Sequence, residues 1–136
     1  MRRSDRLLLN DIRGAIEQIE RHVQNMTFDR FRDSVLHQDA VVRRLEIVGE
    51  AARHLSEETL TTLSDVPWAD VVAMRNRLTH AYFTVDLLVV WETVKDDLPA
   101  LREAVVQALG RLPGCGGDPA TTPSRTPARR WNIRRP

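Results

Sequence analysis

The chain has 136 residues, of which 42% are apolar and 29% are charged, as expected for one globular domain. Its formal net charge of +1 divides unevenly, because residues 1–112 carry a balance of −3 and residues 113–136 a balance of +4. The longest apolar run, Leu87 to Trp91, is far shorter than the roughly 20 residues of a membrane span. A single cysteine, Cys115, excludes an internal disulfide. Together with the absence of a signal-like N-terminus, it predicts a cytoplasmic protein.

The first helix is predicted from apolar residues that recur every three or four positions over the first 23 residues. The residues in this stripe are Leu8, Ile12, Ile16, Ile19 and Val23. Ser4 or Asp5 is expected to cap this helix, because short polar side chains can accept a hydrogen bond from its first turn.

A connector is expected over residues 25–34, with one short turn that Thr27 caps and that buries Phe28 and Phe31. A second helix is predicted from about Val35 to Leu63. Its inward stripe is Leu45, Val48, Ala52 and Leu55. Gly49 lies in this stripe and would allow a neighbouring helix to come close.

A third helix is predicted to begin at Pro67, since proline is tolerated at the first helical position. Its inward residues are Val71, Met74 and Leu78. A break is expected near residues 81–84, followed by a fourth helix capped by Asp86, which Pro99 must kink or restart. The inward residues of this fourth helix are Leu88, Trp91, Val94, Leu98, Leu101, Val105 and Ala108.

These elements predict an all-α fold, an up-and-down bundle of four to five helices over residues 1–112. Residues 113–136 hold five of the seven prolines, three glycines and five arginines. Such a segment buries too little apolar surface to offset the entropy of ordering, so we expect a disordered tail. A solvated tail without a specific partner is the favoured interpretation, although its arginines and Trp131 could also contact RNA.

One segment gathers polar side chains of several chemical types on one part of a helix. At 100° per residue, with Arg75 at 0°, Tyr82 lies at −20°, Thr79 at 40°, Asn76 at 100° and His80 at 140°. Arginine fits phosphate oxygens and histidine moves protons near neutral pH. RNA carries its own nucleophile, the 2′-hydroxyl, so this pair could support strand cleavage without a metal.

Two difficulties keep another interpretation open at this point. Arg75 and His80 diverge by 140° on one straight helix, so convergence would need two copies that share a cleft in a symmetric dimer. An arginine and a histidine five positions apart also occur often by chance. On spacing alone, a helix end whose polar groups are satisfied is favoured over an active site.

The run from Arg75 to Tyr82, RNRLTHAY, resembles the R-x-x-x-x-H-x-Y signature of the HepT-like branch of the HEPN superfamily. The flanking segments resemble the same branch in the same order over about residues 7–109. These segments are Gln38–Ala40, Arg44–Ala51, Val66–Trp68, Val85–Asp86 and Val90–Trp91.

The resemblance implies a helical bundle that dimerises or forms a higher oligomer and brings Arg75 and His80 of two subunits into one cleft. It implies a metal-independent endoribonuclease without cofactors that leaves 2′,3′-cyclic phosphate ends, with Asn76 as a helper. It also implies a toxin whose partner is a minimal nucleotidyltransferase antitoxin of the MntA type. That partner would transfer AMP from ATP onto Tyr82, and the added phosphate would block the RNA backbone.

Two other functions are weighed against this one. The chain could be a non-catalytic helical partner of a nucleotidyltransferase, or a structural adaptor in which the polar arc only ends a helix. Glu46 and Glu50 could form an acid pair or hold a metal, but ion pairs with Arg43, Arg53 or a dimer mate are favoured. Three histidines are predicted at the surface and two tryptophans in the core or an interface: His22, His37 and His54, and Trp68 and Trp91.

Overall fold

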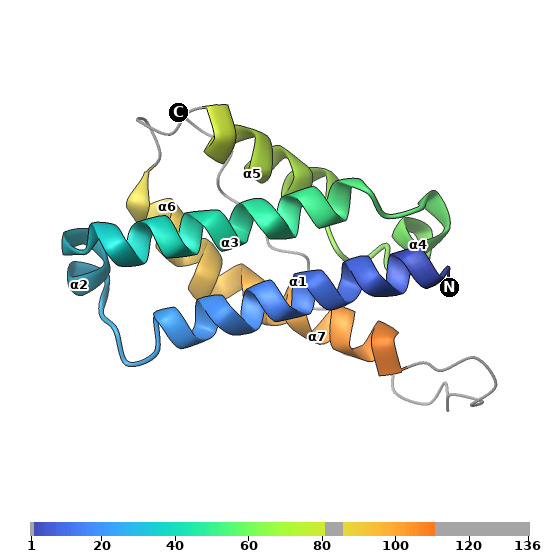
Figure 1. Cartoon of the computed structure of the whole chain (residues 1–136), viewed down its shortest axis with the longest axis horizontal. Helices are drawn as coiled ribbons and strands as arrows, with labels where there is room; N and C mark the ends of the chain where they lie inside the picture. Colours follow the sequence, from blue (N-terminus) through green and yellow to red (C-terminus); the bar gives the residue numbers. More distant parts are fainter. Residues whose placement is uncertain (1, 81–85, 111–136) are drawn as a thin grey trace.

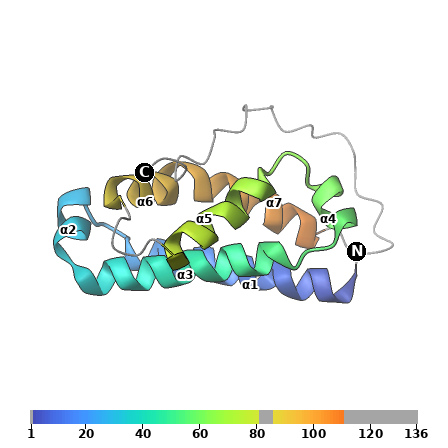
Figure 2. The same cartoon turned by 90° about the horizontal axis from the view of Figure 1, so that it is seen from above.

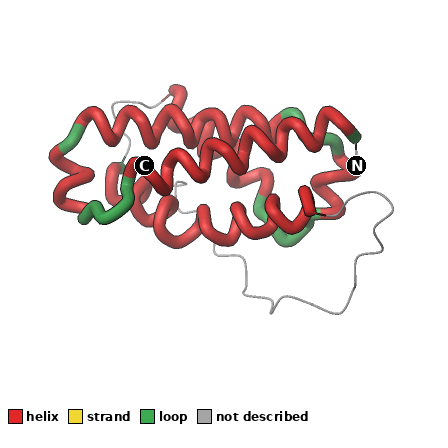
Figure 3. Tube along the Cα trace, turned by 60° about the horizontal axis from the view of Figure 1, so that its bottom comes forward, coloured by secondary structure: helices red, strands yellow, loops and turns green. Residues whose placement is uncertain are grey.

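The computed structural model describes residues 2–80 and 86–110 of the chain, and within these ranges all regular structure is helical (Figure 3). The predicted all-α class is therefore confirmed. The predicted break at residues 81–84, Tyr82 and the predicted tail lie outside the described residues. Of the helices in the described ranges, none has the length and hydropathy needed to span a bilayer.

Two long antiparallel helices, α1 (Arg3–His22) and α3 (Val35–Arg53), lie side by side and form one layer of the bundle (Figure 1). The helix α5 (Trp68–His80) packs against α3 and crosses it obliquely (Figure 2). The last helix, α7 (Leu98–Gly110), packs against α1. The described chain is thus a bundle in which α1 and α3 pack against each other, α5 packs against α3, and α7 packs against α1.

The core forms where the predicted apolar stripes meet. Ile12, Ile16 and Ile19 of α1 are fully buried, as are Leu45 and Val48 of α3. Removing this apolar surface from water is the main source of stability for such a bundle. The stripes predicted for the first two helices are confirmed, with Leu8 only partly buried and its neighbour Leu9 fully buried.

The predicted cap of the first helix is wrong. The helix begins at Arg3, after Arg2, whose side chain makes no capping hydrogen bond. Asp5 lies in the first turn and is only 2% exposed, because its carboxylate accepts hydrogen bonds from Ser56 and Thr59, about fifty residues away. Asp5 therefore ties the start of α1 to a distant helix.

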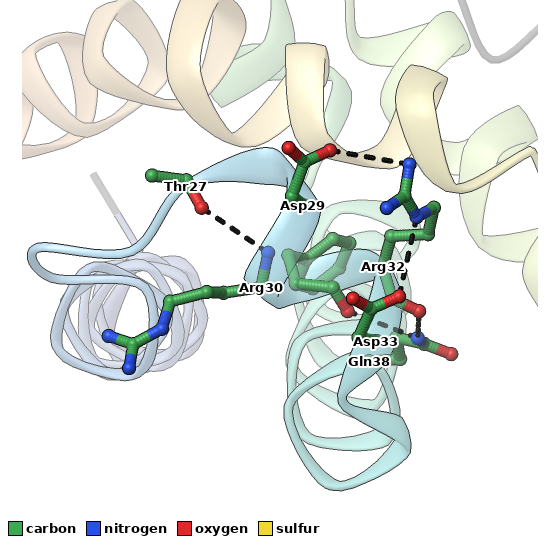
Figure 4. A network of polar contacts seen from close by, with 7 residues as sticks. Thr27, Asp29, Arg30, Arg32, Asp33 and Gln38 are labelled. Atoms are coloured by element: carbon green, nitrogen blue, oxygen red, sulfur yellow. Dashed lines mark hydrogen bonds and ion pairs between the residues drawn. The ribbon is translucent and has the colours of Figure 1, made fainter.

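The connector forms the short helix α2 (Phe28–Asp33), and Thr27 caps it as predicted by accepting a hydrogen bond from the Arg30 N–H (Figure 4). Phe31 is fully buried, and Phe28 packs against the core. Gln38 of α3 donates to the carbonyls of Phe31 and Arg32, at 3.0 and 2.6 Å, and so satisfies the end of α2. Arg32 also pairs with Asp29 and Asp33 on the outside of this corner.

The single helix predicted from Val35 to Leu63 is wrong, because α3 ends at Arg53 and a separate helix, α4 (Glu57–Thr62), follows. Ser56 has an extended backbone and caps α4 by accepting from the Thr59 N–H. The backbone N–H of Ser56 donates to Asp5, at 3.0 Å, and so is not available to continue α3. A contact with α1 thus divides what the periodicity presents as one helix.

The fourth predicted helix is a continuous helical rod with a wider turn inside it: α6 (Leu87–Glu92), the π-helical turn η2 (Thr93–Asp97) and α7. Asp86 caps α6 as predicted, by accepting from the Leu88 N–H. Pro99 is the second residue of α7 and follows the π-helical turn directly, so the change in the helix predicted at Pro99 takes the form of this wider turn. The inward position predicted for Leu88 is wrong, since this side chain is 46% exposed. The core position predicted for Trp91 is confirmed by its ring contacts with Phe28 and Phe31.

Candidate functional site

The helix α5 has one apolar and one polar side, as predicted. Val71, Met74 and Leu78 are at most 1% exposed and anchor the helix in the core. At its start, the buried Trp68 donates from its indole N–H to the carbonyl of Leu63, at 3.0 Å. With one side fixed in this way, α5 turns Arg75 toward the edge of α3, where its side chain is 24% exposed.

The crossing of α3 and α5 depends on Gly49. A Cβ atom at this position would overlap the Cβ of Arg75 and would lie 2.9 Å from its Cγ and 3.2 Å from the carbonyl oxygen of Val71. No side chain other than the hydrogen of glycine fits there without movement of one helix. The close approach of a neighbouring helix predicted at Gly49 is confirmed, and the residue of that helix that lies against Gly49 is Arg75.

Arg75 has two polar neighbours, one on each terminal nitrogen of its guanidinium. Nη1 donates to Oδ1 of Asn76 at 3.0 Å, and Nη2 lies 3.2 Å from Oε2 of Glu50 on α3. Each of these nitrogens carries two hydrogens, so at least one N–H on each is not used in the contact with its neighbour. The predicted site residues Arg75 and Asn76 are therefore brought into direct contact.

Glu50 is the centre of a chain of charges that reaches from α5 to the end of α3. Its Oε1 lies 3.1 Å from Nε2 of His54, and its Oε2 lies 3.9 Å from Nη1 of Arg53. The hydrogen bond from His54 lowers the pKa of Glu50 from 4.5, and the charges of Arg75 and Arg53 act in the same direction against partial desolvation. Glu50 is therefore a carboxylate at neutral pH. We call Asn76, Arg75, Glu50, His54 and Arg53 the Arg75 cluster.

The sequence prediction named some of this cluster and missed the rest. The ion pairs predicted for Glu46 with Arg43 and for Glu50 with Arg53 are present at 3.5 and 3.9 Å. The link from Glu50 to Arg75 was missed, although Gly49, one position earlier, marks the crossing that creates it. Of the three histidines predicted at the surface, His54 is 57% exposed, and its contact with Glu50 was not foreseen.

The remaining predicted site residues lie at or beyond the edge of the described structure. His80 is the last residue of α5, and its side chain is outside the described residues. Tyr82 lies wholly outside them. Within residues 2–80 and 86–110, no three His, Cys, Asp or Glu side chains are grouped so that they could hold a metal ion.

Comparison with known proteins gives a family match over most of the chain. Residues 12–108 match the model of the family described as "Ribonuclease HepT-like". The "Probable ribonuclease HepT" of Thermococcus cleftensis is 41% identical over 102 residues, which cover 75% of this chain and 93% of that protein. A "Putative RNase" of Caldanaerobacter subterraneus is 36% identical over 108 residues, covering 79% and 96%.

A third relative is longer than this chain. It is the "Gamma-glutamylcyclotransferase and putative RNase" of Methanocaldococcus jannaschii, which is 40% identical over 112 residues. The match covers 82% of this chain and spans about half, 50%, of that relative. No solved structure matches the chain.

Proposed function

The chain belongs to the HepT-like ribonuclease family, and from this premise we propose that it is a metal-independent endoribonuclease that acts as a toxin. The proposed products are RNA fragments with 2′,3′-cyclic phosphate ends. The proposed antitoxin is a minimal nucleotidyltransferase that adenylylates Tyr82. The observation that carries this proposal is the Arg75 guanidinium, which contacts Asn76 and Glu50 and is still partly exposed to a ligand.

The proposed cleavage needs one proton-transfer group and one group that stabilises negative charge. The ribose 2′-oxygen attacks the adjacent phosphorus and loses its proton, while the bond from phosphorus to the 5′-oxygen breaks and that oxygen gains a proton. The imidazole of His80 takes part in this proton transfer, since histidine titrates near neutral pH. Arg75 stabilises the extra negative charge of the pentavalent phosphorane, which its planar fork of N–H donors fits.

Two copies of the chain are needed in this proposal. Arg75 and His80 leave one straight helix in directions 140° apart, so one copy would not place both on the same phosphate. A symmetric dimer would bring Arg75 of one protomer near His80 of its partner in a shared cleft. Asn76 then holds the guanidinium of its own protomer at the correct angle through its 3.0 Å contact.

The proposed inactivation acts at the same cleft. The Tyr82 phenol oxygen loses its proton to solvent and bonds to the α-phosphorus of ATP. The bond from the α-phosphorus to the bridging oxygen breaks, pyrophosphate leaves, and AMP remains on the phenol oxygen. Tyr82 and Arg75 are 20° apart around the helix axis if the helix continues that far. The AMP group therefore adds bulk and a negative phosphate on the side of α5 where RNA phosphates would bind.

Cleavage is tested with purified, unmodified chain and RNA in the presence of EDTA. The expected products end in 2′,3′-cyclic phosphates. Arg75→Ala and His80→Ala should abolish cleavage while their thermal unfolding stays close to that of the original chain. If the unmodified chain cleaves no RNA, the proposed function fails and the non-catalytic binding partner becomes the better interpretation. If both folded variants cleave normally, the assignment of Arg75 and His80 as catalytic residues is wrong.

Inactivation is tested by co-expression with the protein encoded beside this chain. Mass spectrometry should find adenylyl groups on Tyr82, and the modified chain should no longer cleave RNA or arrest growth. Tyr82→Phe should remain toxic in the presence of the partner, since it has no hydroxyl to modify. A Tyr82→Phe chain that the partner still neutralises by adenylylation would place the modification elsewhere.

A further inference from the structure

The carboxylate of Glu50 has a place in the Arg75 cluster that neither the signature nor the proposed chemistry assigns. It belongs to α3, whereas Arg75 and Asn76 belong to α5. Its Oε2 is removed from solvent and lies 3.2 Å from Arg75 Nη2, close enough for an ion pair but without hydrogen-bond alignment to a donor in the described residues. A buried carboxylate oxygen in this state requires a cationic neighbour, and Arg75 Nη2 lies closer to it than Arg53 Nη1, which is 3.9 Å away.

Two anchors keep Glu50 in place. Gly49, the preceding residue, fixes the distance between α3 and the Arg75 backbone, because even a methyl group there would overlap Arg75. His54, one turn later, holds Oε1 of Glu50 at 3.1 Å and leaves Oε2 directed toward α5. The carboxylate thus has a defined position before any ligand binds.

Arginine has a long, flexible side chain, and a defined guanidinium orientation must be maintained by its contacts. Asn76 accepts a hydrogen bond from Nη1 and Glu50 forms an ion pair with Nη2, so contacts from two helices restrict the position of the guanidinium. At least one hydrogen on each nitrogen is left for a phosphate oxygen. This is the arrangement expected of a charge-stabilising group that is oriented in advance of the reaction.

We propose that Glu50 is the positioning residue of the site: it holds the Arg75 guanidinium in the orientation that stabilises the phosphorane during RNA cleavage. This inference rests on the proposed ribonuclease function and extends it to a residue on a second helix. Glu50 also places a negative charge beside the RNA phosphate, which weakens binding of the intact strand. Its benefit therefore falls on the reaction step and not on substrate binding.

The test compares Glu50→Gln with Glu46→Gln, the same substitution one turn earlier on α3. Glu46 pairs with Arg43 at 3.5 Å, whereas Arg75 pairs with Glu50, so the Glu46 variant should cleave RNA like the original chain. Glu50→Gln should lower kcat by about ten- to a hundredfold, the range for a misplaced catalytic group. Its KM should stay the same or fall, because a negative charge beside the phosphate is gone.

A second variant separates position from charge. Glu50→Asp keeps the carboxylate but is one methylene shorter, so it should lose the contact with Arg75 and lower kcat without lowering KM. A residue that only stabilised the fold would instead lower the thermal midpoint and leave the kcat of the remaining folded protein unchanged. For both Glu50 variants we expect a thermal midpoint close to that of the original chain.

The outcomes distinguish the two proposals. If the original chain cleaves RNA and Arg75→Ala does not, while both Glu50 variants keep kcat within twofold, the positioning role is overturned and the ribonuclease function stands. If Glu46→Gln loses as much activity as Glu50→Gln, the effect is one of general charge on α3, and the positioning role is again overturned. If the original chain cleaves no RNA, the ribonuclease function is overturned and the role of Glu50 in cleavage with it.

Discussion

Two carboxylates link distant helices in this bundle, and they do so in opposite ways. Asp5 of α1 is 2% exposed and accepts from uncharged donors at the start of α4, namely the N–H and hydroxyl of Ser56, at 3.0 and 2.5 Å, and the hydroxyl of Thr59, at 2.8 Å. Glu50 of α3 has a side chain that is 43% exposed, and its partners are Arg75, Arg53 and His54. Asp5 is thus closed to water, whereas the side chain of Glu50 is open to it.

The difference indicates which cluster can act on a ligand. All three donors around Asp5 belong to the fold and are used by the carboxylate, so a ligand would have to break a buried contact. The guanidinium of Arg75 has more N–H groups than Glu50 and Asn76 occupy, and part of it is accessible. Asp5 with Ser56 and Thr59 therefore stabilises the fold, whereas the Arg75 cluster has the exposed donors that the proposed chemistry needs.

The largest effect on stability is expected from Asp5→Ala. The substitution removes the acceptor of three hydrogen bonds, two from Ser56 and one from the hydroxyl of the buried Thr59. The free energy of unfolding, measured by urea denaturation, should fall by about 3 kcal/mol. Asp11→Ala, at an exposed position of the same helix, is the control and should change it by less than about 0.5 kcal/mol. Equal losses in the two variants would contradict a special role for Asp5.

The next largest effect is expected from Gly49→Ala, which acts on the geometry of the Arg75 cluster. The new methyl group would overlap Arg75, so α3 and α5 must separate. Overpacking of this kind costs about 1–3 kcal/mol, against which the better helix propensity of alanine returns up to about 1 kcal/mol. We expect a net loss of stability of about 1–2 kcal/mol in urea denaturation, together with loss of RNA cleavage.

The matched control for Gly49→Ala is Gly14→Ala in α1. A Cβ atom at Gly14 would meet nothing within 4 Å, so only the gain in helix propensity remains. This variant should be more stable than the original chain by about 0.5–1 kcal/mol. If Gly49→Ala were stabilised to the same extent, the close contact between α3 and Arg75 would not exist in solution.

Features that depend on one helix were predictable from the sequence, and features that depend on where helices cross were not. The apolar stripes and the caps Thr27 and Asp86 follow from spacing and local hydrogen bonding, and the structure confirms them. Asp5 was predicted to be a cap because it is a short polar residue near the start of α1. Its actual partners lie about fifty residues away in the chain, so the local sequence does not reveal them. The end of α3 was missed because Leu55 and Leu63 are buried and prolong the apolar pattern past Arg53.

The candidate site shows the same limit. Arg75 and Asn76 were found because they are neighbours on one helix and belong to one signature. Glu50 was predicted to pair with Arg43, Arg53 or a dimer mate and not with Arg75, since nothing in the local pattern of α3 indicates that α5 crosses there. Gly49 was the available signal, because a glycine inside a buried stripe marks close approach of another backbone.

A smaller effect, and a way to separate the two clusters, is expected from pH. Burial raises the pKa of Asp5, but hydrogen bonds from Ser56 and Thr59 outweigh it, so the pKa is below its ordinary 3.8. The pKa of Glu50 is below 4.5, chiefly because of the hydrogen bond from His54. A carboxylate with a lowered pKa contributes stability above its unfolded-state pKa and loses it as pH falls through the folded-state value.

In urea denaturation, the free energies of unfolding of Asp5→Asn and of the original chain should therefore differ by a constant amount from pH 7 down to about pH 5. The difference should narrow below about pH 3.8, where the unfolded-state Asp5 carboxylate takes up its proton. For Glu50→Gln, the difference in the free energy of unfolding from the original chain should begin to narrow near pH 4.5. A difference that widens in acid would mean that these carboxylates are destabilised in the folded chain.

The smallest effect on stability is expected from Glu50→Gln at neutral pH, because Glu50 pairs with the arginines Arg75 and Arg53 at a surface open to water and salt. Sodium chloride should sharpen the contrast with Asp5. At about 1 M salt the screening length is roughly 3 Å, so the stability difference between Glu50→Gln and the original chain should shrink toward zero. The difference for Asp5→Ala should stay nearly constant, since Asp5 itself is buried and its hydrogen-bond donors Ser56 and Thr59 are uncharged. Urea denaturation at low and high salt measures both. A Glu50→Gln difference unaffected by salt would mean that Glu50 acts on the fold through packing, and the division between a structural and a chemical carboxylate would no longer hold.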